Sequence, residues 1–236
     1  TLQVNNRVGV EMASYDQLNF FDNEINGGRT GYQQYFSEPG GYAEFLRNTF
    51  RGRNGIVGLV APSRADIREN VFDNEKLNVG LIGLGNGSHF WAVQHNTSMS
   101  SSGQNVALYN MDDARIFRNL TMTSSGAQNV VVEGGSNNNV GYNNMTGGQE
   151  GLRIDNTAGN RIYCNDISGA AIGLQVLNNS RNSDILGNLL GGNTVNLRYG
   201  TPDNPMAFSD DQYQAGNFFD LSSTGSPVAI HLGTAA

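Results

Sequence analysis

A repeated unit of 22 to 26 residues constrains this chain more than any other feature of its sequence. In its clearest copy, NRIYCNDISGAAIGLQV, an apolar residue is followed after two variable positions by Asn, then by a second apolar residue and Gly. The Asn recurs at spacings of 25, 22, 26, 23, 24, 22 and 23 residues, as Asn23, Asn48, Asn70, Asn96, Asn119, Asn143, Asn165 and Asn188. A period in this range is typical of a solenoid.

The second half of the unit repeats as well. Nine and eleven residues after the Asn come two apolar residues, such as Leu174 and Val176, or Val57 and Leu59. This short alternation predicts a half-buried strand rather than a helix. Such units cannot bury their apolar residues alone, whereas stacked units pair each strand in parallel with its copy about 4.8 Å away. The pattern predicts an all-β parallel β-helix of about ten coils.

The repeated Asn has two physical reasons to stand at a corner of each coil. Asn tolerates the left-handed backbone conformation that a sharp corner requires. Its amide can also hydrogen-bond to the amide one coil away, as in stacked Asn ladders. We therefore predict an internal asparagine ladder. The alternative is that each Asn only marks an exposed turn.

The repeat runs through nearly the whole chain, so we expect residues 1–236 to form one elongated domain. Val8 and Val10 match the second-strand pair, but the Asn that should precede them is missing. We expect a segment of a longer polypeptide, joined to further domains, or a unit that stacks into a homo-oligomer or filament.

Composition excludes several classes of partner. The net charge is −7, and Lys76 is the only lysine, so nucleic-acid binding is not expected. No stretch is long and apolar enough for a membrane span. The single cysteine, Cys164, can form no internal disulfide, and no Cys/His spacing predicts a metal site. We expect neither a metal nor a cofactor.

One group of residues resembles an enzyme site, since two carboxylates beside a His and an Arg could perform acid–base chemistry on a sugar. Its members, drawn from two consecutive units, are His89, His95, Asp112, Asp113 and Arg118. Nothing in the sequence sets their distances. The residue before each Asn forms its own column, which we interpret mainly as a solvated charge ladder; it reads Asp22, Arg47, Glu69, His95, Arg118, Tyr142 and Cys164.

A second kind of candidate site is aromatic. Trp91, Tyr142 and Tyr163 could contact glycans from the surface of the coils. Trp91 follows a lengthened unit, LGNGSHF, where solenoids place surface loops.

The units resemble those of the right-handed parallel β-helix superfamily that includes pectate lyases. Copies such as NRIYCNDISGAAIGLQVLNN look closest to repeats of large secreted bacterial surface proteins. The resemblance implies a right-handed β-helix and an extracellular or cell-surface location. It does not imply an enzyme, because fold alone does not transfer function. Of the motifs of polygalacturonase-like relatives, only the paired Asp has a counterpart, Asp112–Asp113.

Three functions fit these observations. The leading hypothesis is a non-enzymatic shaft of a secreted or surface protein, with a structural or adhesive role. The first alternative is a polysaccharide lyase or glycoside hydrolase acting on a groove of the β-helix. The second is a glycan-binding module for surface polysaccharide.

Overall fold

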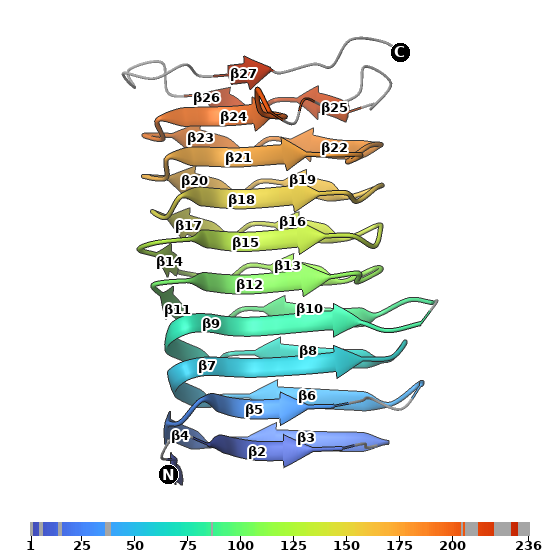
Figure 1. Cartoon of the computed structure of the whole chain (residues 1–236), viewed down its shortest axis with the longest axis vertical. Coiled ribbons are helices and arrows are strands. Elements are labelled where there is room, and N and C mark those ends of the chain that lie inside the picture. Colours follow the sequence, from blue (N-terminus) through green and yellow to red (C-terminus); the bar gives the residue numbers. More distant parts are fainter. Residues whose placement is uncertain are drawn as a thin grey trace.

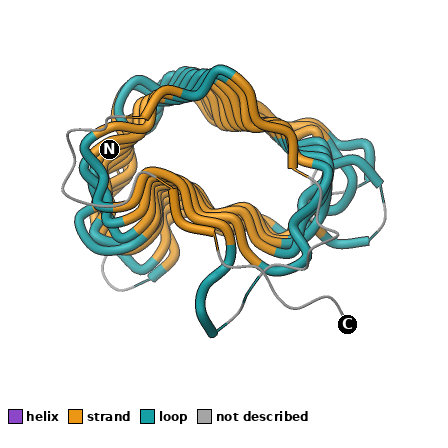
Figure 2. The backbone as a smooth tube through the Cα atoms, turned by 90° about the horizontal axis from the view of Figure 1, so that it is seen from above, coloured by secondary structure: helices purple, strands orange, loops and turns teal. Residues whose placement is uncertain are grey.

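Successive coils of the chain stack into one elongated body in the computed structural model (Figure 1). The structure describes residues 2–4, 7–13, 16–35, 39–85, 87–203, 205, 212–219 and 228–230. Viewed along the long axis, the coils superimpose on one another and enclose a common interior (Figure 2). The predicted right-handed parallel β-helix is therefore confirmed. The described residues contain no helix long and apolar enough to cross a membrane.

Each coil contributes one strand to a nine-stranded parallel sheet, which we call sheet B. Its strands are β3 (Gln17–Phe21), β6 (Tyr42–Leu46), β8 (Arg64–Arg68), β10 (Phe90–Gln94), β13 (Arg115–Phe117), β16 (Asn139–Gly141), β19 (Arg161–Tyr163), β22 (Ser183–Leu186) and β25 (Gln212–Ala215). Nine strands make eight steps from coil to coil among the described residues, slightly fewer than the roughly ten coils expected.

The other strands form an 18-stranded sheet, sheet A, in two rows. The first row, which follows the ladder Asn, contains β1 (Leu2–Val4), β4 (Glu24–Gly27), β11 (Ser98–Ser101), β14 (Met122–Ser124), β17 (Asn144–Thr146), β20 (Asp166–Ser168), β23 (Leu189–Gly191) and β26 (Phe218–Phe219). The second row contains β2 (Val8–Met12), β5 (Thr30–Gln34), β12 (Gln104–Tyr109), β15 (Gln128–Glu133), β18 (Glu150–Asp155), β21 (Ile172–Leu177), β24 (Val195–Tyr199) and β27 (Val228–Ile230). Two long strands, β7 (Thr49–Val60) and β9 (Val71–Gly83), run through both rows.

The predicted asparagine ladder lies between sheet B and the first row. The Nδ2 atom of each ladder Asn donates to the Oδ1 atom of the next, from Asn23 to Asn188, and Asn188 continues the series to Asn217. From Asn48 to Asn188 these residues are at most 1% exposed. The alternative of an exposed turn Asn is therefore wrong for these seven positions.

One of the two reasons given for the Asn needs correction. The left-handed residue at the corner is the one before the ladder Asn, with φ between 51° and 57° from Asp22 to Cys164. The seven residues that were expected to form a charge ladder are therefore the corner residues themselves. The ladder Asn is retained by its hydrogen bonds, not by tolerance of a positive φ.

The alternating pair in the second row is confirmed for most coils, and two positions need correction. Ile56, not Val57, pairs with Val79, so Val57 and Leu59 face outward. The register changes between Gly52 and Asn54, and a one-residue shift reverses the face of every following side chain. In the first described coil of the second row, Val10 pairs with Tyr32, which in turn pairs with Ile56. Val10 rather than Val8 therefore occupies the position equivalent to Ile56.

The interior consists of columns of apolar side chains that continue from coil to coil. Ile67, Val93, Ile116, Val140 and Ile162 stack along sheet B, each at most 1% exposed. A second asparagine stack, which the sequence did not predict, lines the second row: Asn78 donates to Asn105 and Asn105 to Asn129. These columns leave the alternate side chains of sheet B on its outer face.

Candidate functional site

The enzyme-like group is split between the two ends of the sheet B strands. His89 is fully buried before β10, where its Nδ1 accepts from the backbone N–H of Asp112 at 3.4 Å. Asp113 also precedes β13, whereas His95 and Arg118 occupy the corners after β10 and β13. Because β13 runs between the carboxylates and Arg118, the five residues do not form one cluster.

The carboxylate pair is not arranged for joint chemistry. Asp112 accepts a hydrogen bond from the Ser136 hydroxyl at 2.8 Å, which ties it to the next coil. Asp113 adopts a left-handed conformation with φ 58° at the adjoining corner.

Trp91 does not lie on the surface, contrary to the expectation. Its side chain is 1% exposed, and its Nε1 donates to the Ser63 hydroxyl at 3.0 Å inside the coil. The lengthened loop before it led to the wrong assignment. In β10 the alternation places Phe90 outside, 47% exposed, and Trp91 inside.

The two other predicted aromatics come together with a third ring on the outer side of sheet B. Tyr142 and Tyr163 have ring centroids 5.4 Å apart, and Phe117 lies 5.2 Å from Tyr142 and 6.3 Å from Tyr163. We call these three residues the aromatic patch. Tyr142 is 47% exposed, and the other two rings are half-buried.

A glycine makes room for this arrangement. Phe117, Gly141 and Tyr163 occupy equivalent positions in β13, β16 and β19. A Cβ atom at Gly141 would lie only 2.8 Å from Cζ of Tyr163, so the ring of Tyr163 rests on the backbone of Gly141. Without this space the ring could not approach Phe117 across the intervening coil. Gly141 is therefore a positioning residue for the patch.

Two arginines and a histidine border the aromatic patch. The Arg118 guanidinium lies over the rings of Phe117 and Tyr142, 5.0 and 5.5 Å from their centroids. Arg161 lies 5.6 Å from the centroid of Tyr163, and His95 contacts Phe117 edge-on at 6.5 Å. Cation–π contacts of this kind hold an arginine in place while its outer side stays hydrated.

The hydroxyl of Tyr142 can both donate and accept hydrogen bonds. A hydrogen bond with Cys164 raises the pKa of Tyr142 above its usual value near 10. Rings with a polar tip, beside fixed cations, suit a ligand that is part apolar and part hydroxylated.

The sequence identified Tyr142, Tyr163 and Arg118 but missed Phe117 and Gly141. Both stand in strands of sheet B at the position two residues before the ladder Asn, which is exposed or half-buried in most coils, although Leu46 and Gly141 are buried. That column reads Phe21, Leu46, Arg68, Gln94, Phe117, Gly141, Tyr163 and Leu186. Only the contact between alternate coils shows that Phe117 and Tyr163 belong to one surface.

Comparison with known proteins adds one family. Residues 47–223 match the family model described as "Periplasmic copper-binding protein (NosD)". The match covers most of the described coils, including all of the aromatic patch. No curated protein and no solved structure matches the chain significantly.

Proposed function

The chain belongs to the NosD family of periplasmic β-helix proteins, and from this premise we propose that it is a non-enzymatic shaft of the cell envelope that attaches to polysaccharide. The aromatic patch carries this proposal, because it brings three rings into mutual contact on the outer face of sheet B. The C–H face of a sugar ring packs on aromatic rings, while its hydroxyls can reach Tyr142, Arg118 and Arg161. The continuous ladder and core supply the rigid support.

The description of the family includes copper, so the question arises whether side chains of this chain could bind a copper ion. Copper prefers imidazole and sulfur ligands. Within the described part of the chain, no three His, Cys, Asp or Glu side chains lie close enough together to hold a metal ion. Met99, Met122 and Met145 stack in register, but each is fully buried in the core. These residues do not fit a copper site, and the proposed function does not involve one.

Glycan binding by the aromatic patch is testable with one double variant. Tyr142→Ala combined with Tyr163→Ala should weaken binding of a matching polysaccharide by about tenfold or more, because each aromatic contact contributes roughly 0.5–1.5 kcal/mol. A glycan array would identify the polysaccharide, and isothermal titration calorimetry would measure the affinity. Gly141→Ala should weaken binding as well, since it displaces the ring of Tyr163.

Phe218→Ala provides the matched control, because Phe218 is 62% exposed on sheet A and lies away from the patch. This variant should bind like the wild type. Equal affinity of the double variant and the wild type would contradict the proposal. Release of unsaturated or reducing ends from any polysaccharide would show instead that the chain is an enzyme.

A further inference from the structure

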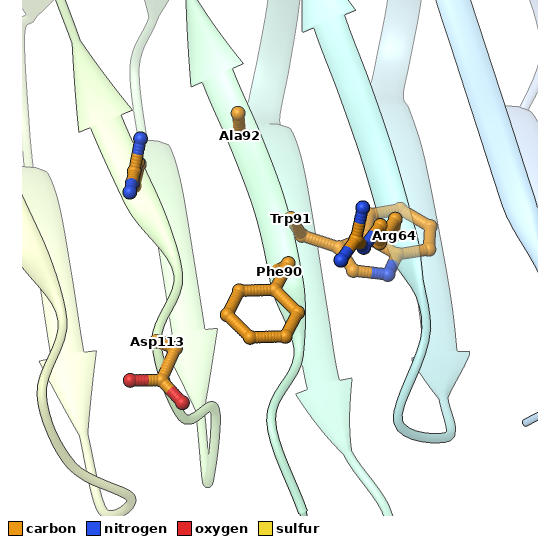
Figure 3. Close-up of a pocket in the computed structure, with 6 residues that line it drawn as sticks. Arg64, Phe90, Trp91, Ala92 and Asp113 are labelled. Carbon is orange, nitrogen blue, oxygen red and sulfur yellow. The ribbon is translucent and has the colours of Figure 1, made fainter. Parts of the chain in front are cut away.

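A hollow of about 240 Å³ lies on the same outer face of sheet B, in the coils of β8, β10 and β13, the last of which also contains Phe117 of the aromatic patch. Figure 3 shows the exposed ring of Phe90 between Arg64 and Asp113. We call this hollow the arginine pocket; it is lined by Arg64, Phe90, Trp91, Ala92, Asp113 and Arg115. Its members come from β8, β10 and β13 and from the corner before β13.

Two exposed arginines of this pocket lack a carboxylate partner. Within the residues that the structure describes, neither Arg64 nor Arg115 forms an ion pair, even though Asp113 lines the same hollow. The neighbouring Arg68 is different, since it contacts the carboxylates of Glu44, Asp66 and Glu69 at 2.6, 3.3 and 3.0 Å. The pocket therefore offers two guanidinium groups to a ligand, whereas Arg68 is already neutralised.

The pocket also has an apolar surface beside these charges. Phe90 is 47% exposed, and the guanidinium of Arg64 lies 5.4 Å from the centroid of its ring. A planar guanidinium binds a carboxylate through two parallel hydrogen bonds. An exposed ring beside such a group accommodates a sugar ring that carries a carboxylate.

The arginine pocket and the aromatic patch form one continuous strip. Arg115 and Phe117 are alternate residues of β13 and so point to the same side of the sheet. The strands of Phe90 and Tyr163 are three coils apart, which corresponds to about 14 Å along the axis. Phe90 also lies four residues along the strand direction from the column of Phe117 and Tyr163, about 13 Å across the sheet, so the strip runs diagonally. An extended chain of a few sugar units lying diagonally across this face would contact both ends of the strip.

We propose that the arginine pocket binds carboxylate groups of an acidic polysaccharide whose chain lies along the outer face of sheet B. This inference rests on the glycan binding proposed above and adds the chemical class of the glycan. Single-stranded nucleic acid also uses stacking rings and arginines. The net charge of −7 opposes a polyphosphate along the whole chain, so a sparsely charged glycan is favoured.

Two probes of equal length test this inference: an oligomer in which uronic acid units alternate with neutral sugars, and the same oligomer with its carboxyl groups reduced to alcohols. The wild type should bind the acidic oligomer at least about tenfold more tightly, and rising salt should weaken that preference. Arg64→Gln combined with Arg115→Gln should remove the preference, so that the variant binds the acidic and the reduced oligomer with equal affinity. Arg53→Gln, an exposed arginine of β7 in sheet A, is the control and should behave like the wild type.

The possible results separate this inference from the proposed function. If both oligomers bind equally, or if the double arginine variant keeps the preference, the inference is wrong while glycan binding by the patch stands. Tighter binding of an oligothymidine than of the acidic oligomer would also overturn it. If neither oligomer nor any arrayed glycan binds, both the inference and the proposed function are wrong. Circular dichroism of each variant verifies that the fold is kept.

Discussion

A single asparagine side chain explains why each coil stays in register with the next. Asn143 Nδ2 donates to Asn165 Oδ1 at 3.0 Å and to the carbonyl of Ile116 at 2.9 Å. Its Oδ1 accepts from the backbone N–H and the Nδ2 of Asn119, at 3.1 and 2.8 Å. The amide thus uses both donors and both acceptor sites in a buried position, where an unmade hydrogen bond costs about 1–3 kcal/mol.

The neighbouring pair Asn143 and Asn144 gives a test at the residue scale. Asn143→Ala should lower the free energy of unfolding by at least about 2 kcal/mol, because several buried groups lose their partners. Asn144 is exposed on β17, so Asn144→Ala should change it by less than about 0.5 kcal/mol. Urea denaturation of the two variants measures the difference. A similar loss of stability for both would contradict the role assigned to the ladder.

At the scale of the element, the corners decide how a coil closes. Every corner before a ladder Asn, from Asn23 to Asn188, contains a residue with positive φ, and one of these positions is Gly187, with φ 59°. A different corner, before β16, contains Gly135, with φ 67°. A left-handed backbone conformation costs a non-glycine residue about 1–2 kcal/mol. The interactions between stacked coils offset this cost at the non-glycine corners.

Alanine substitutions at these two glycines distinguish the cost of backbone strain from the cost of a steric clash. A Cβ atom at Gly187 would meet only Cys164 Sγ, at 3.7 Å, so Gly187→Ala should cost about 1–2 kcal/mol of backbone strain. A Cβ atom at Gly135 would overlap the carbonyl oxygen of Met111, so Gly135→Ala should cost about 1–3 kcal/mol more. Thermal denaturation gives the comparison. If the Gly187 variant were the less stable one, the tight packing assigned to the Gly135 corner would be refuted.

At the scale of the whole molecule, one apolar cluster runs through all the described coils. It is continuous because inward residues of each coil contact those of the coils before and after. In a solenoid, each coil interacts mainly with its neighbours, so stability spreads along the axis through these contacts. The rod that results presents the aromatic patch and the arginine pocket on the outer face of one sheet, sheet B.

Removing a core side chain from a middle coil should therefore lower the stability of the whole solenoid. Ile116 is fully buried between Val93 and Val140, and Ile116→Ala should cost about 2–5 kcal/mol. The unfolding curve should shift as one transition, since the cluster is unbroken. Leu120→Ala is the control, because Leu120 is 64% exposed. Two separate transitions for the Ile116 variant would show that the coils on either side unfold independently.

The fold could be predicted from the sequence, because each unit repeats its inward residues at positions that stacking must bring together. The period, the ladder from Asn23 to Asn188 and most second-row pairs followed from that repetition. The second ladder did not, since Asn78, Asn105 and Asn129 follow their ladder Asn by 8, 9 and 10 residues and show no constant spacing. Insertions change the sequence spacing between such residues, but the residues still stack on one another in the structure.

Only the tertiary structure decided which outward residues form a site. Outward side chains obey no burial requirement, so their columns carry no pattern that predicts contact. Tyr163 contacts Phe117 across a whole coil because Gly141 leaves room for its ring. This contact cannot be predicted from the repeat unit of either residue. Conversely, Trp91 turned inward because strand alternation overrides the exposed loop before it. The periodicity of the sequence determines which side chains face the interior of each coil. Contacts between coils determine which outward side chains form a common surface.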